Sequence, residues 1–146
     1  MPRSRFPLLF CLLVLIGVAP ALEAAIKGTG LPLPRFVSLR AGEVNLRTGP
    51  GIQYPVDWVY LRQNLPMEII AEYGTWRKVR DWRGTQGWVH QSMVSGLRTL
   101  IITGNKRTVR RKANFQSPPV AILEAGVIGK LLSCPDLNGW GRGDVA

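Results

Sequence analysis

Short runs in which apolar and polar residues alternate follow one another from Phe36 onward, and glycine or proline separates them. No stretch of the chain holds the apolar period of an amphipathic helix. Short strands at close spacing, joined by Gly- and Pro-containing turns, are typical of a small all-β barrel. The expected strands lie near residues 36–40, 44–47, 58–61, 67–73, 75–80 and 86–89.

The stretch Val44-Asn45-Leu46-Arg47-Thr48-Gly49-Pro50-Gly51 defines one of these strands and its end. Successive side chains of a strand point to opposite faces, so Val44 and Leu46 are expected in the core and Asn45 and Arg47 outside. The Gly-Pro-Gly turn removes a backbone donor and permits positive φ, which stops the strand. Asn45 could satisfy backbone groups of the next loop. Arg47 could cover an aromatic ring, pair with an acid or contact a ligand.

A second, weaker copy of the same pattern is expected from Thr99 to the end of the chain. The segment Thr99–Thr103 repeats 36–40, Thr108–Arg111 repeats 45–48, and Leu131-Leu132 repeats Ile69-Ile70, with an offset that drifts from 63 to 62 to 64. Nothing after Trp140 matches the closing strand of the first copy. Either the chain is truncated at Ala146, or the first barrel supplies an edge to the second copy.

Three motifs in the first copy resemble the bacterial SH3-like (SH3b) domain family. They are the strand and turn at 44–51, Gly74-Thr75-Trp76-Arg77-Lys78-Val79, and Gly87-Trp88-Val89, in the family's order within residues 36–96. The resemblance implies an SH3-like barrel of five to six short antiparallel strands with a binding role, often toward peptidoglycan or peptides. The residues that carry this structural motif are Val44, Asn45, Leu46, Gly49, Pro50, Trp76, Gly87 and Trp88, of which Trp76 and Trp88 match core positions of the family.

The N-terminus has the features of a secretory signal peptide. Arg3 and Arg5 precede an apolar run from Phe6 to Val18, and small residues follow up to a cut site near Ala21. We therefore expect a helical signal peptide over 1–21, a Gly- and Pro-containing linker over 22–35, and a periplasmic or secreted mature protein. An uncleaved membrane anchor is the alternative, although the apolar run is short for a span of about 30 Å.

Charge and cysteine content refine this picture. The chain has 19 Lys and Arg against 9 Asp and Glu, and cleavage at Ala21 would leave a net charge of +8. Cleavage would also remove Cys11, so that Cys134 is the only thiol and no intrachain disulfide can form. Because Leu131–Cys134 is expected to be a strand, we expect Cys134 to be buried.

Aromatic residues supply the candidate ligand contacts. Seven fall between Tyr54 and Trp88, including every Tyr and four of the five Trp, which is more than a barrel of this size can bury. Tyr60 is expected in the core. Exposed rings can stack on sugars or on proline residues of a peptide. The candidate ligand-binding residues are Arg47, Tyr54, Trp58 and Trp82.

A basic run is the second candidate surface. Its members are Lys106, Arg107, Arg110, Arg111 and Lys112. It is either a solvated strand and loop, or a patch for an anionic partner such as a wall polymer, an acidic protein or, weakly, an anionic membrane surface. Nucleic acid would suit such a patch chemically, but the export signal argues against it.

Enzymatic function is not expected. His90 and Cys134 lie in different copies, and no orienting third group accompanies them. No metal-ligand cluster or phosphate-binding loop is present in the sequence, so we expect no cofactor and no metal. The sequence predicts a non-catalytic periplasmic binding module for peptidoglycan or a wall-associated partner. It does not specify the oligomeric state. The alternative is a subunit that binds a proline-rich or acidic peptide of an envelope complex; a wall hydrolase is less favoured.

Overall fold

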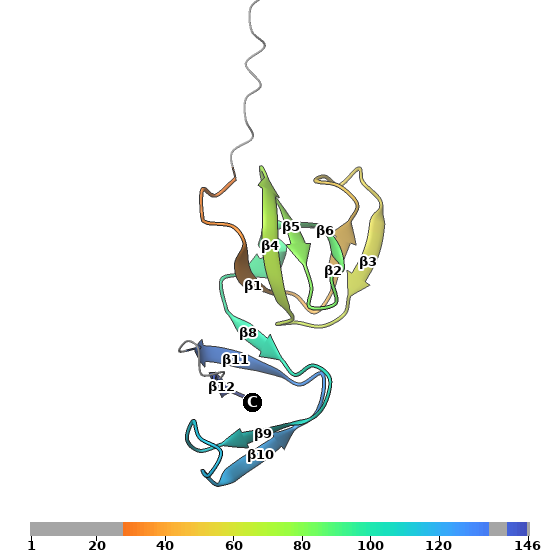
Figure 1. The fold of residues 1–146 in the computed structure, drawn as a ribbon. Helices are drawn as coiled ribbons and strands as arrows, with labels where there is room; N and C mark the ends of the chain where they lie inside the picture. Colours follow the sequence, from red (N-terminus) through yellow and green to blue (C-terminus); the bar gives the residue numbers. More distant parts are fainter. Residues whose placement is uncertain (1–27, 135–139, 146) are drawn as a thin grey trace, which may run out of the picture.

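The computed structural model describes residues 28–134 and 140–145, and in these ranges the protein is built from antiparallel strands (Figure 1). The only helix among the described residues is a single 3-10 turn, η1 (Gln91–Met93). No helix in these ranges is long and apolar enough to cross a membrane. The all-β fold class is therefore confirmed, whereas the predicted signal peptide and its cut site at Ala21 lie outside the described residues.

Seven strands form the first unit, a barrel drawn in orange to green in Figure 1. Their order in the sheet is β3-β2-β6-β5-β4-β1-β7, and every pair is antiparallel. The sequence did not predict β7, which follows η1 and pairs with the free edge of β1. The strands are β1 (Arg35–Leu39), β2 (Val44–Arg47), β3 (Val56–Tyr60), β4 (Pro66–Tyr73), β5 (Trp76–Arg80), β6 (Gln86–His90) and β7 (Val94–Ser95).

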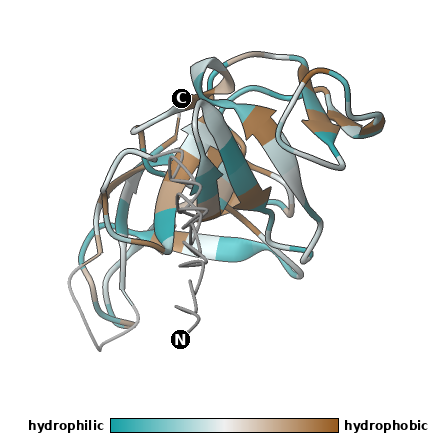
Figure 2. Ribbon diagram, turned by 90° about the horizontal axis from the view of Figure 1, so that it is seen from above, coloured by the Kyte–Doolittle hydropathy of each residue, from teal (hydrophilic) through white to brown (hydrophobic). Residues whose placement is uncertain are grey.

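The core of this barrel follows the alternation of the sequence. Val44 and Leu46 are fully buried, Asn45 is exposed, and Arg47 is half-buried, as expected for a strand with one face inward. Figure 2 shows brown and teal segments alternating along the strands. The buried apolar side chains form one cluster: Val37, Leu39, Val44, Leu46, Tyr60, Leu65, Met67, Ile69, Val79, Val89 and Val94.

The assignment of Trp76 and Trp88 to the core was wrong. Val79 and Val89 are the inward-facing residues of β5 and β6, so alternation turns both tryptophans to the outer face, where they are half-buried. Trp76 stands edge-on to the ring of His90, with 5.6 Å between centroids. Trp88 pairs with Arg47 and with Lys78 on the two neighbouring strands.

The arm that precedes β1 is held to the barrel by Glu72 on β4. The Glu72 carboxylate accepts hydrogen bonds from the backbone and hydroxyl of Thr29 and from the guanidinium of Arg35, and it lies 3.2 Å from Nε of the buried Arg77. Burial alone would raise the pKa of Glu72. The hydrogen bonds from Arg35 and Thr29 outweigh this effect and hold the pKa below its ordinary value.

The second unit contains β8 (Thr99–Ile101), β9 (Arg107–Arg110), β10 (Pro119–Leu123), β11 (Ile128–Ser133) and β12 (Arg142–Asp144), drawn in cyan to blue (Figure 1). They form two separate sheets, β10-β9 and β12-β11-β8. Among the described residues no strand of the first barrel pairs with these sheets, so the predicted supply of an edge by the first barrel is not observed.

The loop between β3 and β4 joins the two units. Thr99 Oγ1 donates a hydrogen bond of 2.7 Å to the carbonyl of Asn64, and Arg62 Nη1 donates one of 2.7 Å to the carbonyl of Gly126. Ile101 and Ile128 also pack against the core cluster of the first barrel. The start of β8 and the turn before β11 therefore both contact one loop of the first unit.

Candidate functional site

A row of side chains crosses the outer face of the first barrel near its junction with the second unit. Phe36 on β1 lies opposite Glu68 on β4, which lies opposite Arg80 on β5. Arg80 donates two hydrogen bonds, of 2.9 and 2.6 Å, to Oε2 of Glu68. Phe36 is 65% exposed, which is unusual for a ring that lies on a paired strand.

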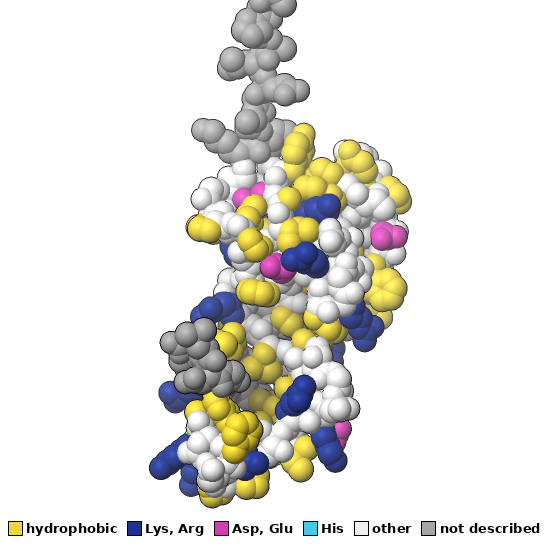
Figure 3. Space-filling model, viewed as in Figure 1, with side chains coloured by type: hydrophobic (Ala, Val, Ile, Leu, Met, Phe, Trp, Pro, Cys, Tyr) yellow, Lys and Arg dark blue, Asp and Glu magenta, His cyan; other side chains and the backbone are white. Residues whose placement is uncertain are grey.

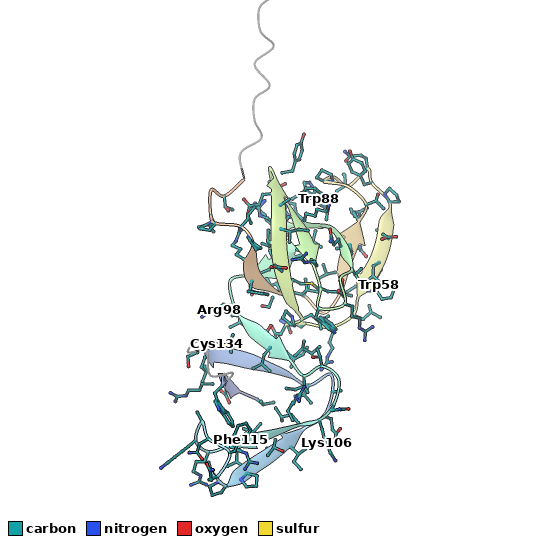
Figure 4. The ribbon with its side chains drawn as sticks, in the orientation of Figure 1. Trp58, Trp88, Arg98, Lys106, Phe115 and Cys134 are labelled. Atoms are coloured by element: carbon teal, nitrogen blue, oxygen red, sulfur yellow. The ribbon has the colours of Figure 1, made fainter. Side chains whose placement is uncertain are left out.

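The second unit forms the opposite wall, so that the row lines a groove. This junction groove has a volume of about 520 Å³. Figure 4 shows Arg98 and Cys134 on this wall, at β8 and at the end of β11. The lining residues are Phe36, Pro66, Met67, Glu68, Arg80, Asp81, Trp82, Arg98, Thr99, Leu100, Ile101, Leu131 and Cys134.

Cys134 is exposed in the groove, and the expectation that it is buried was wrong. The strand β11 ends at Ser133, one residue before the thiol, and its last two residues are exposed as well.

The loop after β5 presents Trp82 to the groove, and Asp81 holds that loop in place. Asp81 is buried, and its carboxylate accepts hydrogen bonds from the backbone N–H groups of Arg83 and Thr85 at 2.8 and 2.9 Å. The hydroxyl of Tyr60 donates to the same carboxylate at 3.0 Å. Burial raises the pKa of the Tyr60 hydroxyl well above its ordinary value, and the adjacent carboxylate adds to this rise, so Tyr60 remains a neutral donor.

The structure separates the predicted ligand residues rather than gathering them. Only Trp82 lines the junction groove; it is 39% exposed, with the Arg83 guanidinium 5.6 Å from its ring centroid. Trp58 is exposed on the edge strand β3 and contacts Tyr60 edge-on (Figure 4). Tyr54 packs its ring over Gly49 in the loop after β2.

Arg47 braces the same loop. Its Nη1 donates hydrogen bonds to the carbonyls of Tyr54 and Ile52, at 2.7 and 3.2 Å. The guanidinium therefore replaces the backbone partners that this irregular segment lacks. A ligand contact by Arg47 would have to use its remaining donors.

The basic run lies on β9 and on the residues directly before and after it, in the second unit. Lys106, Arg107, Arg111 and Lys112 are exposed, and no ion pair involving the run is found in the described part of the chain. Arg110 is half-buried and donates a hydrogen bond of 2.8 Å to the carbonyl of Ser117. The run is distant in sequence from the groove-lining aromatics, and its residues do not line that groove.

Side chains that could hold a metal do not converge in the ranges that the structure describes. No three His, Cys, Asp or Glu side chains there could hold a metal ion together. The Nδ1 atom of His90 lies 2.8 Å from Ser92 Oγ, beside η1. The arrangement offers aromatic faces and guanidinium groups, which bind ligands by stacking and ion pairing.

Sequence reasoning missed Phe36, Arg98 and Leu131 as groove residues. The pattern predicts Phe36 only as an ordinary strand residue. The charges of its cross-strand partner Glu68 and of Arg80, which lies opposite Glu68, mark its face as the outer one. Because the opposite wall comes from a unit whose position no local pattern specifies, the groove itself had no signal in the sequence.

The comparison with protein families bears on the first barrel. The model of the bacterial SH3 domain matches residues 40–96, which span β2 to β7. Residues 40–96 form a bacterial SH3 domain. Bacterial SH3 domains are in general binding modules rather than enzymes. A comparison with curated proteins found no match to the chain.

Proposed function

We propose that this protein is a non-catalytic binding module of the bacterial cell envelope, and that its junction groove binds peptidoglycan or a wall-associated partner. The observation that carries the proposal is the groove itself, where the exposed rings of Phe36 and Trp82 accompany Arg80 and Arg98. Aromatic faces stack on sugar rings, and guanidinium groups bind carboxylates. A glycan that carries acidic peptides offers both.

The charge of the protein supports an anionic wall partner. The formal net charge is +10 for the whole chain, and a positive field raises the association rate with polyanions. Location in the periplasm rests on the N-terminal sequence pattern alone. Determination of the N-terminus of the mature protein tests it, and a first residue at or near Leu22 is expected.

Sedimentation of the full chain with purified sacculi tests the proposed ligand. At low salt the protein is expected in the pellet, and Trp82→Ala and Phe36→Ala are each expected to weaken retention about tenfold, the size of a typical aromatic hot spot. Ile52→Ala is the matched control, because Ile52 is the most exposed large apolar side chain of the barrel and does not line the groove. It should leave retention unchanged.

Three outcomes decide between the candidate functions. Absence of sedimentation at low salt would contradict wall binding. Retention by an envelope protein together with indifference to sacculi would instead favour the alternative of a protein-interaction subunit. Equal loss of binding in Trp58→Ala and Trp82→Ala, with both variants folded, would place the ligand across β3 as well as the groove.

A further inference from the structure

The strands of the second unit pair as the first five strands of the barrel do. The pair β8·β11 matches β1·β4, β9·β10 matches β2·β3, and β11·β12 matches β4·β5. The agreement extends to individual residues. Leu100 pairs with Gly129 as Val37 pairs with Met67, and Arg107 pairs with Leu123 as Val44 pairs with Tyr60.

The bulges agree as well. In β4·β5 the register shifts between Ile69 and Ala71, and in β11·β12 it shifts between Leu131 and Ser133, at the corresponding place. The pair β9·β10 shifts next to Arg110 as β2·β3 shifts next to Arg47. A bulge at the same position in two ladders is a specific feature rather than a general property of sheets.

What the second unit lacks in the described ranges is a counterpart of β6. In the first barrel β6 pairs with β5 on one side and with β2 on the other, and so joins the two halves of the sheet. In the second unit the counterparts of β5 and β2 are β12 and β9, and these two strands belong to separate sheets. Both therefore present unpaired backbone groups toward each other.

A cavity of about 580 Å³ occupies this place, and we call it the β9–β12 slot. It is lined by residues 107–113 and 140–143, together with Leu100, Ile102 and Leu123. Figure 3 shows the second unit hollowed here, with yellow apolar side chains inside and blue Lys and Arg side chains around the opening. Gly141 and Gly143 stand where β5 has Arg77 and Val79, so β12 contributes no inward side chain to fill the slot.

From these observations we infer that residues 99–145 are a second SH3-like unit in which no described residue supplies the closing strand, and that the slot binds an extended segment of another polypeptide as that strand. The template is β6, whose inward residues are Gly87 and Val89. The incoming segment accordingly carries apolar residues at alternating positions, and its backbone pairs with β12 and β9.

The charges around the slot specify the outward residues of that segment. In the first barrel Trp88 lies between Arg47 and Lys78, and the corresponding neighbours in the second unit are Arg110 and Arg142. Arg107, Arg111 and Lys112 also line the slot, and none of its lining residues within 28–134 and 140–145 is acidic. Asp or Glu between the apolar positions is therefore the complementary choice, because like charges across a ladder are unfavourable.

The test uses the full chain and a labelled seven-residue peptide in which Val and Glu alternate, with blocked ends. Binding is measured by fluorescence anisotropy, and its location by amide hydrogen exchange. We expect saturable binding that weakens with salt, and slower exchange in β9 and β12. The same peptide with Lys in place of Glu, and one with a central Pro, are expected not to bind.

Two charge reversals locate the site further. Arg142→Glu is expected to weaken binding of the Glu peptide about fivefold to tenfold, from the strength of one exposed ion pair and its reversal. Lys106→Glu is the matched control, because Lys106 is exposed just before β9 but does not line the slot. It should leave the affinity unchanged.

Four results would overturn the inference. The first two are absence of Glu-peptide binding at about 1 mM, a weak affinity by the scale of such complexes, and equal binding of the Lys peptide. The third is that the Glu peptide slows exchange in the first barrel instead of in β9 and β12. The fourth is slow exchange of β9 and β12 before any peptide is added. The last result counts against the inference only where it does not depend on protein concentration, because a dependence would show that a second copy of the chain already supplies the segment.

Discussion

At the scale of single residues, the packing of the barrel depends on Gly87, a position where a side chain does not fit. A Cβ atom on Gly87 would lie 2.5 Å from Cγ of Leu46 and 2.9 Å from the carbonyl oxygen of Arg47. Leu46 is fully buried and the oxygen belongs to the backbone, so neither can move easily. Gly87 thus allows β6 to lie directly over the core beside β2.

Gly87→Ala is therefore expected to lower the free energy of unfolding by about 1–3 kcal/mol, the usual cost of overpacking. Urea denaturation followed by tryptophan fluorescence measures it. Gly96→Ala is the matched control, because a Cβ there meets no atom within 4 Å, and it is expected to change stability by less than about 0.5 kcal/mol. Equal effects of the two variants would show that the close approach of β6 to Leu46 is unimportant.

Glu72 gives the stability a pH dependence. The folded-state pKa lies below the ordinary value of 4.5, so the ionised carboxylate contributes fully to stability above pH 4.5. That contribution is lost as the pH falls through the folded-state pKa. The slope of unfolding free energy against pH in the acid range should be smaller in Glu72→Gln than in the wild type, whereas Glu43→Gln, at an exposed position, should keep the wild-type slope.

At the scale of elements, the loop between β5 and β6 is ordered by one carboxylate. Asp81→Ala removes the acceptor for Tyr60 Oη and for two backbone N–H groups. We expect a loss of about 1–3 kcal/mol in stability, because the Tyr60 hydroxyl is left without a partner. Hydrogen exchange at Arg83 and Thr85 should accelerate. Asp57→Ala, on the exposed face of β3, is the control, and a similar loss there would rule out a specific role of Asp81.

The elements also show what sequence patterns can predict. The first six strands and the inward positions of Val44, Leu46 and Tyr60 followed from alternation and turn residues, which are local properties. Trp76 and Trp88 were misplaced because the family resemblance assigned them to core positions, although Val79 and Val89 already occupied the inward positions of their strands. The strand β7 has two residues, too few for a periodic signal.

The candidate site could be predicted only in part, for the same reason. The exposure of Trp58 and Trp82 follows from the excess of aromatic residues over the available core. Their separation, and the meeting of Phe36 with Trp82 and Leu131 in one groove, depend on contacts between distant segments. Neither composition nor spacing contains that information.

At the scale of the whole molecule, the buried core belongs to one of the two units. Every member of the core cluster lies between Val37 and Val94, whereas most side chains described in the second unit are exposed or half-buried. A fragment ending after Arg98 should therefore unfold cooperatively. A fragment of residues 99–146 should show weak, non-cooperative unfolding. Calorimetry of both fragments checks this, and a sharp transition in the second fragment would contradict it.

The pairing of β1 with β7 has a consequence for how the barrel can be joined to other proteins. Ser38 lies opposite Ser95 and Leu39 opposite Val94, in antiparallel register, so the chain enters and leaves at the same end of the sheet. Ser38 and Ser95 are separated by about one strand spacing, roughly 5 Å, and the start of β1 at Arg35 lies only three residues before Ser38. Such a module can be grafted into an exposed loop of an unrelated host without stretching either partner. Its architecture suits it to be gained, lost or transplanted as a single cassette.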